Sequence, residues 1–135
     1  MTEFKSNTLS INKPAPTLFL FLSDFNNFEK LMPEQVINWQ SSTERCSFTI
    51  KGMADMAMYM KEKAAPTLVV YASEGNSKIS FNLQFSIVEK SGSQSEITTT
   101  LQAQLNAMLK MMASRPLQNF VNIITEKFKE IQEEG

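Results

Sequence analysis

The side chains that most often carry out chemistry in proteins are scarce in this sequence. It contains no histidine, a single cysteine at Cys46, and only 4 glycines. Without histidine there is no imidazole general base, no Ser-His or Cys-His nucleophile, and no imidazole ligand for a metal. One cysteine excludes an internal disulfide and would leave a zinc ion with carboxylates alone. The sequence therefore predicts no metal, no cofactor and no known catalytic motif.

The groups left for proton transfer are Tyr59, Tyr71, Asp55 and the glutamates, which the pattern places on or beside strands. A tyrosine on a strand is more often a core or rim anchor than an acid, and Asp55 is expected to be solvated. Cys46 is expected to be a small, inert apolar residue on an inward face. Each would matter for catalysis only if its polar group pointed into a cavity with a shifted pKa.

Composition and charge narrow the class of protein. The 135 residues are 42% hydrophobic and 20% charged, with a net charge of −1, as in one ordinary globular domain spanning residues 1–135. Nothing in that charge favours a nucleic acid. No apolar run approaches the ~20 residues of a membrane span, and Met1–Lys5 lacks the layout of a signal peptide. We expect a cytoplasmic monomer or weak homodimer with no nucleic-acid partner and no integral membrane segment.

A long amphipathic helix is predicted over residues 114–133. Its apolar positions recur every three or four residues, which places them on one face. Ser114 is positioned to cap this helix and Pro116 to lie in its first turn. Residues 108–112 lead into it, either as a connector or as an early turn. The stripe consists of Leu117, Phe120, Val121, Ile124, Phe128 and Ile131.

The middle of the chain predicts a sheet with one apolar and one polar face. A strand is expected over residues 3–12, then short helices over 15–23 and 25–32, the second capped by Asp24 and ended by Pro33. From residue 34 the period changes to two, typical of strands. We expect these strands over 36–40, with Ile37 and Trp39 on one face, and over 44–51, 53–63, 67–73, 79–88 and 96–105.

This order of elements resembles the START-like, or SRPBCC, superfamily, which includes Bet v 1 allergens and polyketide cyclases. Three segments carry the resemblance: Phe28-Glu29-Lys30-Leu31-Met32-Pro33, the meander from Val36 to Leu105, and the helix from Arg115-Pro116-Leu117 to Ile131. The resemblance implies an α+β helix-grip fold of order β-α-α-β5-6-α. In it, a curved antiparallel sheet of about six to seven strands wraps a long C-terminal helix. It also implies a cavity between them that often holds an apolar ligand or lipid.

The leading hypothesis is a non-catalytic carrier or sensor of a small hydrophobic or amphipathic molecule. Seven of the nine methionines fall into two groups, 53–60 and 108–112, which either fill the core or form a pliable wall for a ligand. A helix-grip fold would bring both groups near the gap between sheet and helix. The residues expected to contact the ligand are Trp39, Phe48, Met56, Met58, Phe81, Leu83, Phe85, Leu117, Phe120, Val121 and Ile124.

Two other hypotheses stay open from the sequence. The first is a cyclase- or hydrolase-like enzyme that uses the same pocket, with a tyrosine or carboxylate handling protons. The second is a protein–protein interaction module whose core is filled by its own side chains, which the ten phenylalanines could do. The second hypothesis predicts a contiguous exposed apolar patch.

Overall fold

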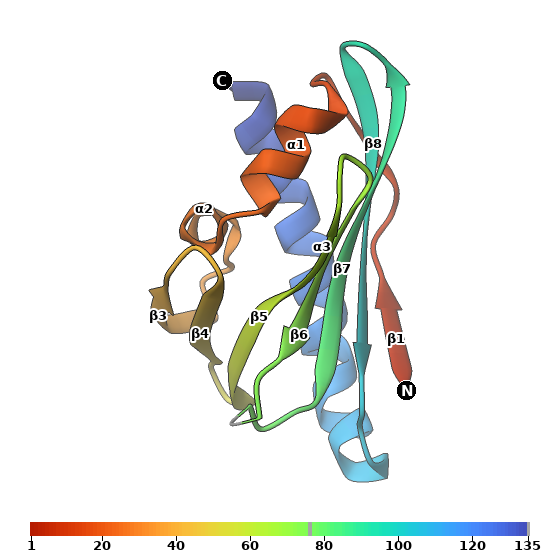
Figure 1. Ribbon diagram of the computed structural model, residues 1–135. Helices are drawn as coiled ribbons and strands as arrows, with labels where there is room; N and C mark the ends of the chain where they lie inside the picture. The colour runs from red at the N-terminus through yellow and green to blue at the C-terminus, as the bar shows by residue number, and fades with distance from the viewer. Residues whose placement is uncertain (76, 135) are drawn as a thin grey trace.

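The computed structural model describes residues 1–75 and 77–134, and it has one curved antiparallel sheet that embraces a long C-terminal helix (Figure 1). The elements in chain order are β1 (Thr2–Lys5), β2 (Leu9–Ile11), α1 (Ala15–Leu22), α2 (Phe25–Phe28), the 3-10 turn η1 (Glu29–Leu31), β3 (Val36–Ser41), β4 (Arg45–Ile50), β5 (Ala54–Ala64), β6 (Leu68–Ser73), β7 (Phe81–Ser91), β8 (Gln94–Ala103) and α3 (Ala107–Glu134). This is the α+β helix-grip architecture that the sequence predicts.

The strands follow the order β1-β8-β7-β6-β5-β4-β3, and β2 also pairs with β8. The described part of the chain thus forms an eight-stranded sheet, compared with the six or seven strands expected. The difference arises because the strand expected over 3–12 is split in two. Between β1 and β2, Ser6 accepts a hydrogen bond from the amide of Thr99 through its hydroxyl, at 2.9 Å. The chain bulges there before it pairs with β8 again.

Alternation of residue type decides which face of the sheet is buried. Along β7 and the residue pair before it, Ile79, Phe81, Leu83, Phe85 and Ile87 are all buried, as their two-residue period predicts. The intervening serine, asparagine and glutamine side chains lie on the other, solvated face. The predicted inward set of β4, which includes Cys46 and Phe48, is buried too. This apolar inner face is the surface against which the helices pack.

One predicted face is wrong. Ile37 and Trp39 do not share the inner face of β3, because the pairing of β3 with β4 shifts between Ile37 and Gln40. The shift is a β-bulge at Asn38, whose φ of 58° lies in the left-handed region. A bulge adds one residue to the strand and reverses the faces on its two sides. Trp39 therefore packs against the core together with Val36, whereas Ile37 is exposed.

The C-terminal helix is longer than predicted. It begins at Ala107 rather than near Ser114, because Asn106 caps it: the Asn106 side chain accepts a hydrogen bond from the amide of Leu109 at 2.9 Å. Ser114 instead donates its hydroxyl to the carbonyl of Lys110. Pro116 lies inside the helix rather than in its first turn. The added turns extend past the strand ends at the lower edge of the molecule (Figure 1).

The predicted stripe of α3 packs onto the sheet, and polar contacts fix the remainder of the helix. Five of its six residues are buried, with Ile131 partly buried. Thr125, which is not part of the stripe, is buried as well and donates to the hydroxyl of Thr99 at 2.6 Å. Lys127 donates its ammonium to the carbonyl of Met32 at 2.8 Å, and Lys129 to that of Ser10 at 2.6 Å. The C-terminal half of α3 is therefore attached on both flanks.

The two short helices cover the part of the inner face that α3 leaves open. Asp24 caps α2 as predicted, accepting from the amide of Asn26 at 2.9 Å. Tyr71 of β6 is fully buried beneath these helices and donates its hydroxyl to the carbonyl of Leu22 at 2.6 Å. Its ring centroid lies 4.7 Å from that of Phe25 and 5.3 Å from that of Phe28. This aromatic cluster joins α1 and α2 to the sheet.

Candidate functional site

A cleft of about 270 Å³ opens between α3 and the edge of the sheet. β3 is the last strand of the sheet, and among residues 1–75 and 77–134 no further strand fills the space between it and the helix. The lining comes from the start of β3, the end of β4 and one flank of α3. It consists of Pro33, Gln35, Val36, Ile50, Lys51, Arg115, Pro116, Asn119, Phe120 and Ile123. Most of these contribute apolar surface to the cleft.

The inner wall of the cleft is the first ring of an aromatic stack. Phe120 stacks on Phe48, with ring centroids 6.2 Å apart and an interplanar angle of 14°. Phe48 stacks on Trp39 at 5.6 Å and 20°, and Trp39 on Phe28 at 6.3 Å and 21°. Four near-parallel rings thus connect the cleft with the centre of the core. Such offset stacking stabilises the wall beyond the area it buries.

The one polar group of this stack, the indole N–H of Trp39, has a hydrogen-bond partner. The indole N–H of Trp39 donates to the hydroxyl of Ser41 at 3.0 Å, which donates to the side-chain oxygen of Asn26 at 2.8 Å. Trp39 is therefore held in place at the rim and does not offer its N–H to the cleft.

The electrostatics of the cleft come from two cations. Lys51 lines it from the turn after β4 and Arg115 from α3, and both side chains are exposed. Within the described ranges, the lining includes no aspartate, glutamate or tyrosine. The cleft thus combines an apolar wall with a positively charged rim. This arrangement suits a ligand with an apolar body and a polar or negatively charged end.

The structure brings the residues expected to contact a ligand into one core. All of them are buried except Trp39, which is partly buried. Of this set, Phe120 lines the cleft directly. Phe48 and Trp39 lie behind it in the stack, and the remaining members are packed deeper between sheet and helices: Met56, Met58, Phe81, Leu83, Phe85, Leu117, Val121 and Ile124. Their role as ligand contacts stays a prediction.

The candidates for proton transfer lie elsewhere. Tyr71 is buried among phenylalanines, and this burial raises the pKa of its hydroxyl well above the usual range. Tyr59 stands on β5 with the guanidinium of Arg45 6.0 Å from its ring centroid. Asp55 is exposed and accepts a hydrogen bond from Thr49 at 2.7 Å. Burial also raises the pKa of the Cys46 thiol, so that it stays protonated at neutral pH.

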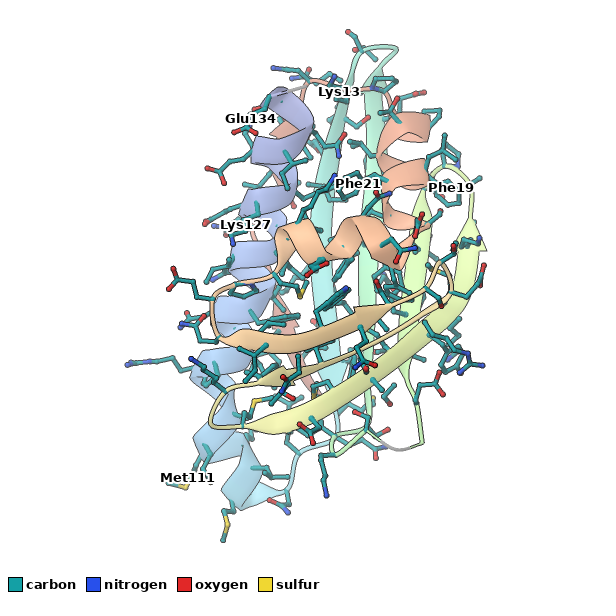
Figure 2. All side chains as sticks on the ribbon, turned by 90° about the vertical axis from the view of Figure 1, so that its left-hand side faces the viewer. Lys13, Phe19, Phe21, Met111, Lys127 and Glu134 are labelled. Carbon is teal, nitrogen blue, oxygen red and sulfur yellow. The ribbon has the colours of Figure 1, made fainter. Side chains whose placement is uncertain are left out.

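The second methionine group was expected near the gap between sheet and helix, and this is wrong. Met108, Met111 and Met112 are 70%, 87% and 63% exposed. They belong to the turns of α3 that project past the sheet, and Figure 2 shows Met111 at this free end of the helix. Met56 and Met58 of the first group are buried as expected.

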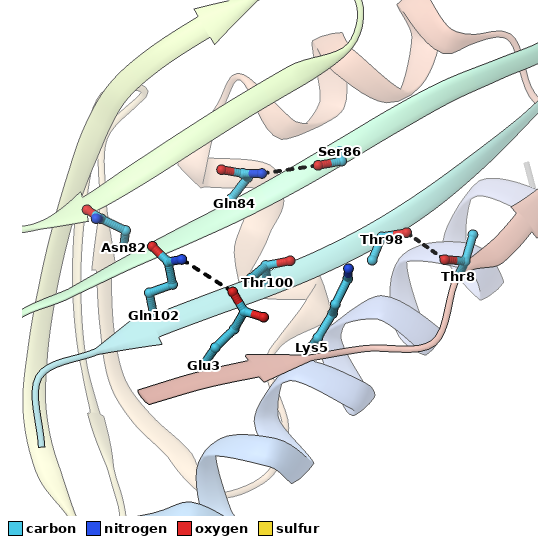
Figure 3. Close-up of a pocket in the computed structure, with 9 residues that line it drawn as sticks. All are labelled: Glu3, Lys5, Thr8, Asn82, Gln84, Ser86, Thr98, Thr100 and Gln102. Atoms are coloured by element: carbon cyan, nitrogen blue, oxygen red, sulfur yellow. Dashed lines mark hydrogen bonds between the residues drawn. The ribbon is translucent and has the colours of Figure 1, made fainter. Parts of the chain in front are cut away.

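A second hollow, of about 350 Å³, lies on the outer face of the sheet over β1, β7 and β8 (Figure 3). Its walls are polar, and several of its groups bond one another. Gln102 donates to Glu3 at 3.3 Å, and the hydroxyls of Thr8 and Thr98 are 2.8 Å apart. A polar hollow open to water offers little apolar surface to a hydrophobic ligand. We therefore take the cleft beside α3 as the candidate site.

The described residues form neither a metal site nor a membrane-spanning helix. Among residues 1–75 and 77–134 there is no group of three or more histidine, cysteine, aspartate or glutamate side chains that could hold a metal ion. Within the same ranges, no helix has the length and apolar character needed to cross a bilayer.

Sequence reasoning missed most of the cleft lining because these residues stand at element ends rather than in the middle of patterns. Val36 begins β3, Ile50 ends β4, and Lys51 follows it. A signal was present on the helix. Pro116, Asn119 and Ile123 recur at three- and four-residue spacing along the flank of the buried stripe, which marks a second helix face beside the first.

Comparison with known proteins adds evidence on the fold. No protein-family model and no curated protein matches the sequence. Solved structures match over nearly the whole chain. A START superfamily protein from Mycobacterium smegmatis has a TM-score of 0.70 at 13% identity, covering 98% of this chain and 97% of that one. A norcoclaurine synthase from Thalictrum flavum, in complex with a transition-state analogue, has a TM-score of 0.71 at 7% identity, with coverages of 98% and 94%.

A third solved structure, XoxI from Bacillus cereus, has a TM-score of 0.75 at 7% identity and covers 98% of this chain and 96% of that one. Identities this low carry information on the fold alone. Together with the sheet order and the α3 packing, they show that this chain has the START/SRPBCC-like helix-grip fold.

Proposed function

We propose that the protein binds a small hydrophobic or amphipathic molecule in the cleft between α3 and the β3–β4 edge, as a non-catalytic carrier or sensor. The observation that carries this proposal is an open apolar cleft bounded by Phe120 and rimmed by Lys51 and Arg115. The fold supports it, because a START/Bet v 1-like architecture is consistent with ligand binding between sheet and helix.

The size of the cleft limits what it can enclose. Pockets that bury drug-sized ligands have volumes of roughly 300–1,000 Å³. The cleft, at about 270 Å³, lies just below this range. A single acyl chain or one small ring system fits that volume, and a larger molecule would enter only if the Phe120–Phe48 stack moved inward. The deeper residues Trp39, Met56 and Phe85 would become ligand contacts only if a larger molecule moved the stack.

The charge at the rim favours one end of the ligand. Lys51 and Arg115 place two cations beside an apolar wall, so a carboxylate or phosphate group at the mouth would be stabilised. An amphiphile with a cationic end would be repelled. We therefore expect fatty acids to bind more tightly than alkylamines of the same chain length.

The test is a titration with a fluorescent fatty-acyl probe, together with mass spectrometry of molecules extracted from gently purified protein. Ile123→Trp fills the cleft from its helix wall, and we expect it to abolish saturable probe binding. Glu130→Trp adds the same ring at an exposed position of the same helix and serves as the control. Lys51→Gln combined with Arg115→Gln should weaken fatty-acid binding while leaving a neutral alcohol probe unchanged.

Three outcomes would argue against the proposal: no saturable binding and no extracted molecule, binding that survives Ile123→Trp, or equal loss with Glu130→Trp. Chemical conversion of the extracted ligand by the purified protein would favour the enzyme hypothesis instead.

A further inference from the structure

The first two turns of α3 carry an exposed apolar surface that the cleft does not explain. Met108, Met111 and Met112 are spaced by three and four residues and lie on one helix face, which we call the methionine stripe. Their exposed fractions are 70%, 87% and 63%. Large apolar side chains gathered this way on a surface mark a site of interaction.

The charges around the methionine stripe are mostly positive. Residues 107–115 of α3 include Lys110 and Arg115 and no acidic residue, and both side chains are exposed. Lys78 and Leu109 line a neighbouring hollow, in which Asp55 is the one acid among the described lining residues. Lys51 lies across the cleft from Arg115. The N-terminus of a helix adds its own partial positive charge.

The C-terminal half of α3 has a negative net charge, because its glutamates outnumber Lys127 and Lys129. The acids of α3 all lie in this half, at Glu126, Glu130, Glu133 and Glu134. A negatively charged surface would therefore attract the end with the methionine stripe and repel the other end. The net charge of −1 for the whole chain conceals this separation along the helix.

The charge pattern also selects among possible occupants. A second copy docked on the same surface would bring Lys110 and Arg115 against the same two cations, and like charges brought together at an interface are costly. The helix turns that carry the stripe project beyond the strand ends (Figure 1). A projecting helix end with unbranched, flexible side chains can insert them between lipid headgroups, while flanking cations contact anionic lipids.

We infer that the methionine stripe docks the protein on an anionic lipid bilayer. Arg115 belongs both to the charged surround of the stripe and to the rim of the cleft, so docking would turn the mouth of the cleft toward the membrane. The docking inference stands apart from ligand binding, because the stripe and its charges would be present even if the cleft held nothing.

The experiment measures co-sedimentation of the full chain with phosphatidylcholine vesicles, with and without phosphatidylglycerol. We expect binding to the mixed vesicles only, decreasing as salt is raised. Replacing all three stripe residues, Met108→Ser, Met111→Ser and Met112→Ser, should weaken binding to the mixed vesicles by at least about tenfold, since the inserted apolar area is lost. Lys110→Gln should weaken it and reduce the salt dependence.

The matched control is the double variant Leu20→Ser and Val88→Ser. These residues are 69% and 54% exposed and lie on α1 and β7, away from the stripe. The control removes exposed apolar side chains without touching the stripe and should bind vesicles as the unmodified chain does. All the substituted residues are exposed, and circular dichroism serves to check that each variant is folded.

Several results would overturn the inference: no binding to anionic vesicles, equal binding to neutral vesicles, or binding that the triple variant retains. Light scattering without lipid supplies a further test, because a dimer that the triple variant dissociates would assign the stripe to a second copy. Probe titration in solution separates the two proposals. A triple variant that binds the fatty-acyl probe normally but does not bind vesicles supports docking. If the unmodified chain binds vesicles but not the probe, only the proposal of ligand binding in the cleft is refuted.

Discussion

Tyr71→Phe tests the reasoning about the buried aromatic cluster most sharply, because it removes one hydroxyl and little else. The Tyr71 hydroxyl donates to the carbonyl of Leu22 at 2.6 Å, and its ring is fully enclosed by Phe25, Phe28 and Phe85. Without the hydroxyl, this buried carbonyl loses its partner. At neutral pH we expect the free energy of unfolding to fall by ~1–3 kcal/mol.

The same variant should behave differently at high pH. Burial raises the pKa of Tyr71 in the folded chain, whereas in the unfolded chain the pKa returns to about 10. Above pH ~10 the unfolded state therefore holds fewer protons than the folded state, so stability present below that pH is lost as pH rises. Above that pH, Tyr71 lowers the free energy of unfolding of the unmodified protein by about 1.4 kcal/mol per pH unit. The phenylalanine variant has no such decrease.

The difference in the free energy of unfolding between the two proteins should thus shrink above pH ~10. It should vanish roughly 1–2 pH units higher, because a difference of ~1–3 kcal/mol is removed at ~1.4 kcal/mol per pH unit. Urea unfolding followed by far-ultraviolet circular dichroism at a series of pH values measures this difference directly. All other ionisable groups are common to the two proteins, so their contributions largely cancel in this difference. Tyr59→Phe, on a partly exposed strand position, is the control. A difference that stays constant with pH would refute the reasoning.

Three further substitutions give measurable outcomes by urea unfolding. Asn106→Ala removes the side-chain acceptor for the amide of Leu109 and should cost ~0.5–2 kcal/mol, with Asn106→Asp retaining most of the stability. Pro116→Ala restores a helical N–H and should raise the free energy of unfolding by about 2 kcal/mol. This is the ~3 kcal/mol penalty of proline inside a helix, less the entropy that the unfolded chain regains without proline. An unchanged free energy of unfolding would contradict this. Phe48→Ala empties the centre of the ring stack and should cost ~3–5 kcal/mol, while raising the affinity for the fatty-acyl probe if the cleft extends inward.

The fold was predictable because hydrophobic period is a strong local signal. β7 alternates over its whole buried length, and the stripe of α3 repeats without interruption from Leu117 to Phe128. The predictions that are wrong concern features that depend on non-local or single-residue effects. The bulge at Asn38 reverses a face without any change in residue type nearby. The start of α3 was misplaced because Pro116 is a common first-turn residue, whereas here the Asn106 cap starts the helix earlier.

The candidate site was predictable only in part. The sequence indicates which side chains are apolar and inward, but not where packing stops short of closing. Phe48 and Phe120 are both predicted ligand contacts; they stack on each other, and of the two Phe120 lines the cleft. The open volume lies along the face of α3 beside its buried stripe, between Val36 and Ile123. Its position depends on the sheet ending at β3, which is a property of topology.

The bulge in β3 has a consequence for the behaviour of the protein in a crowded solution. A sheet that ends in a regular strand offers a row of free amides and carbonyls to any extended chain, and copies can polymerise through such edges. At Asn38 the ladder is interrupted, so a visiting strand would lose register after a few residues. The bulge at Asn38 therefore discourages fibre growth from the β3 edge of the sheet.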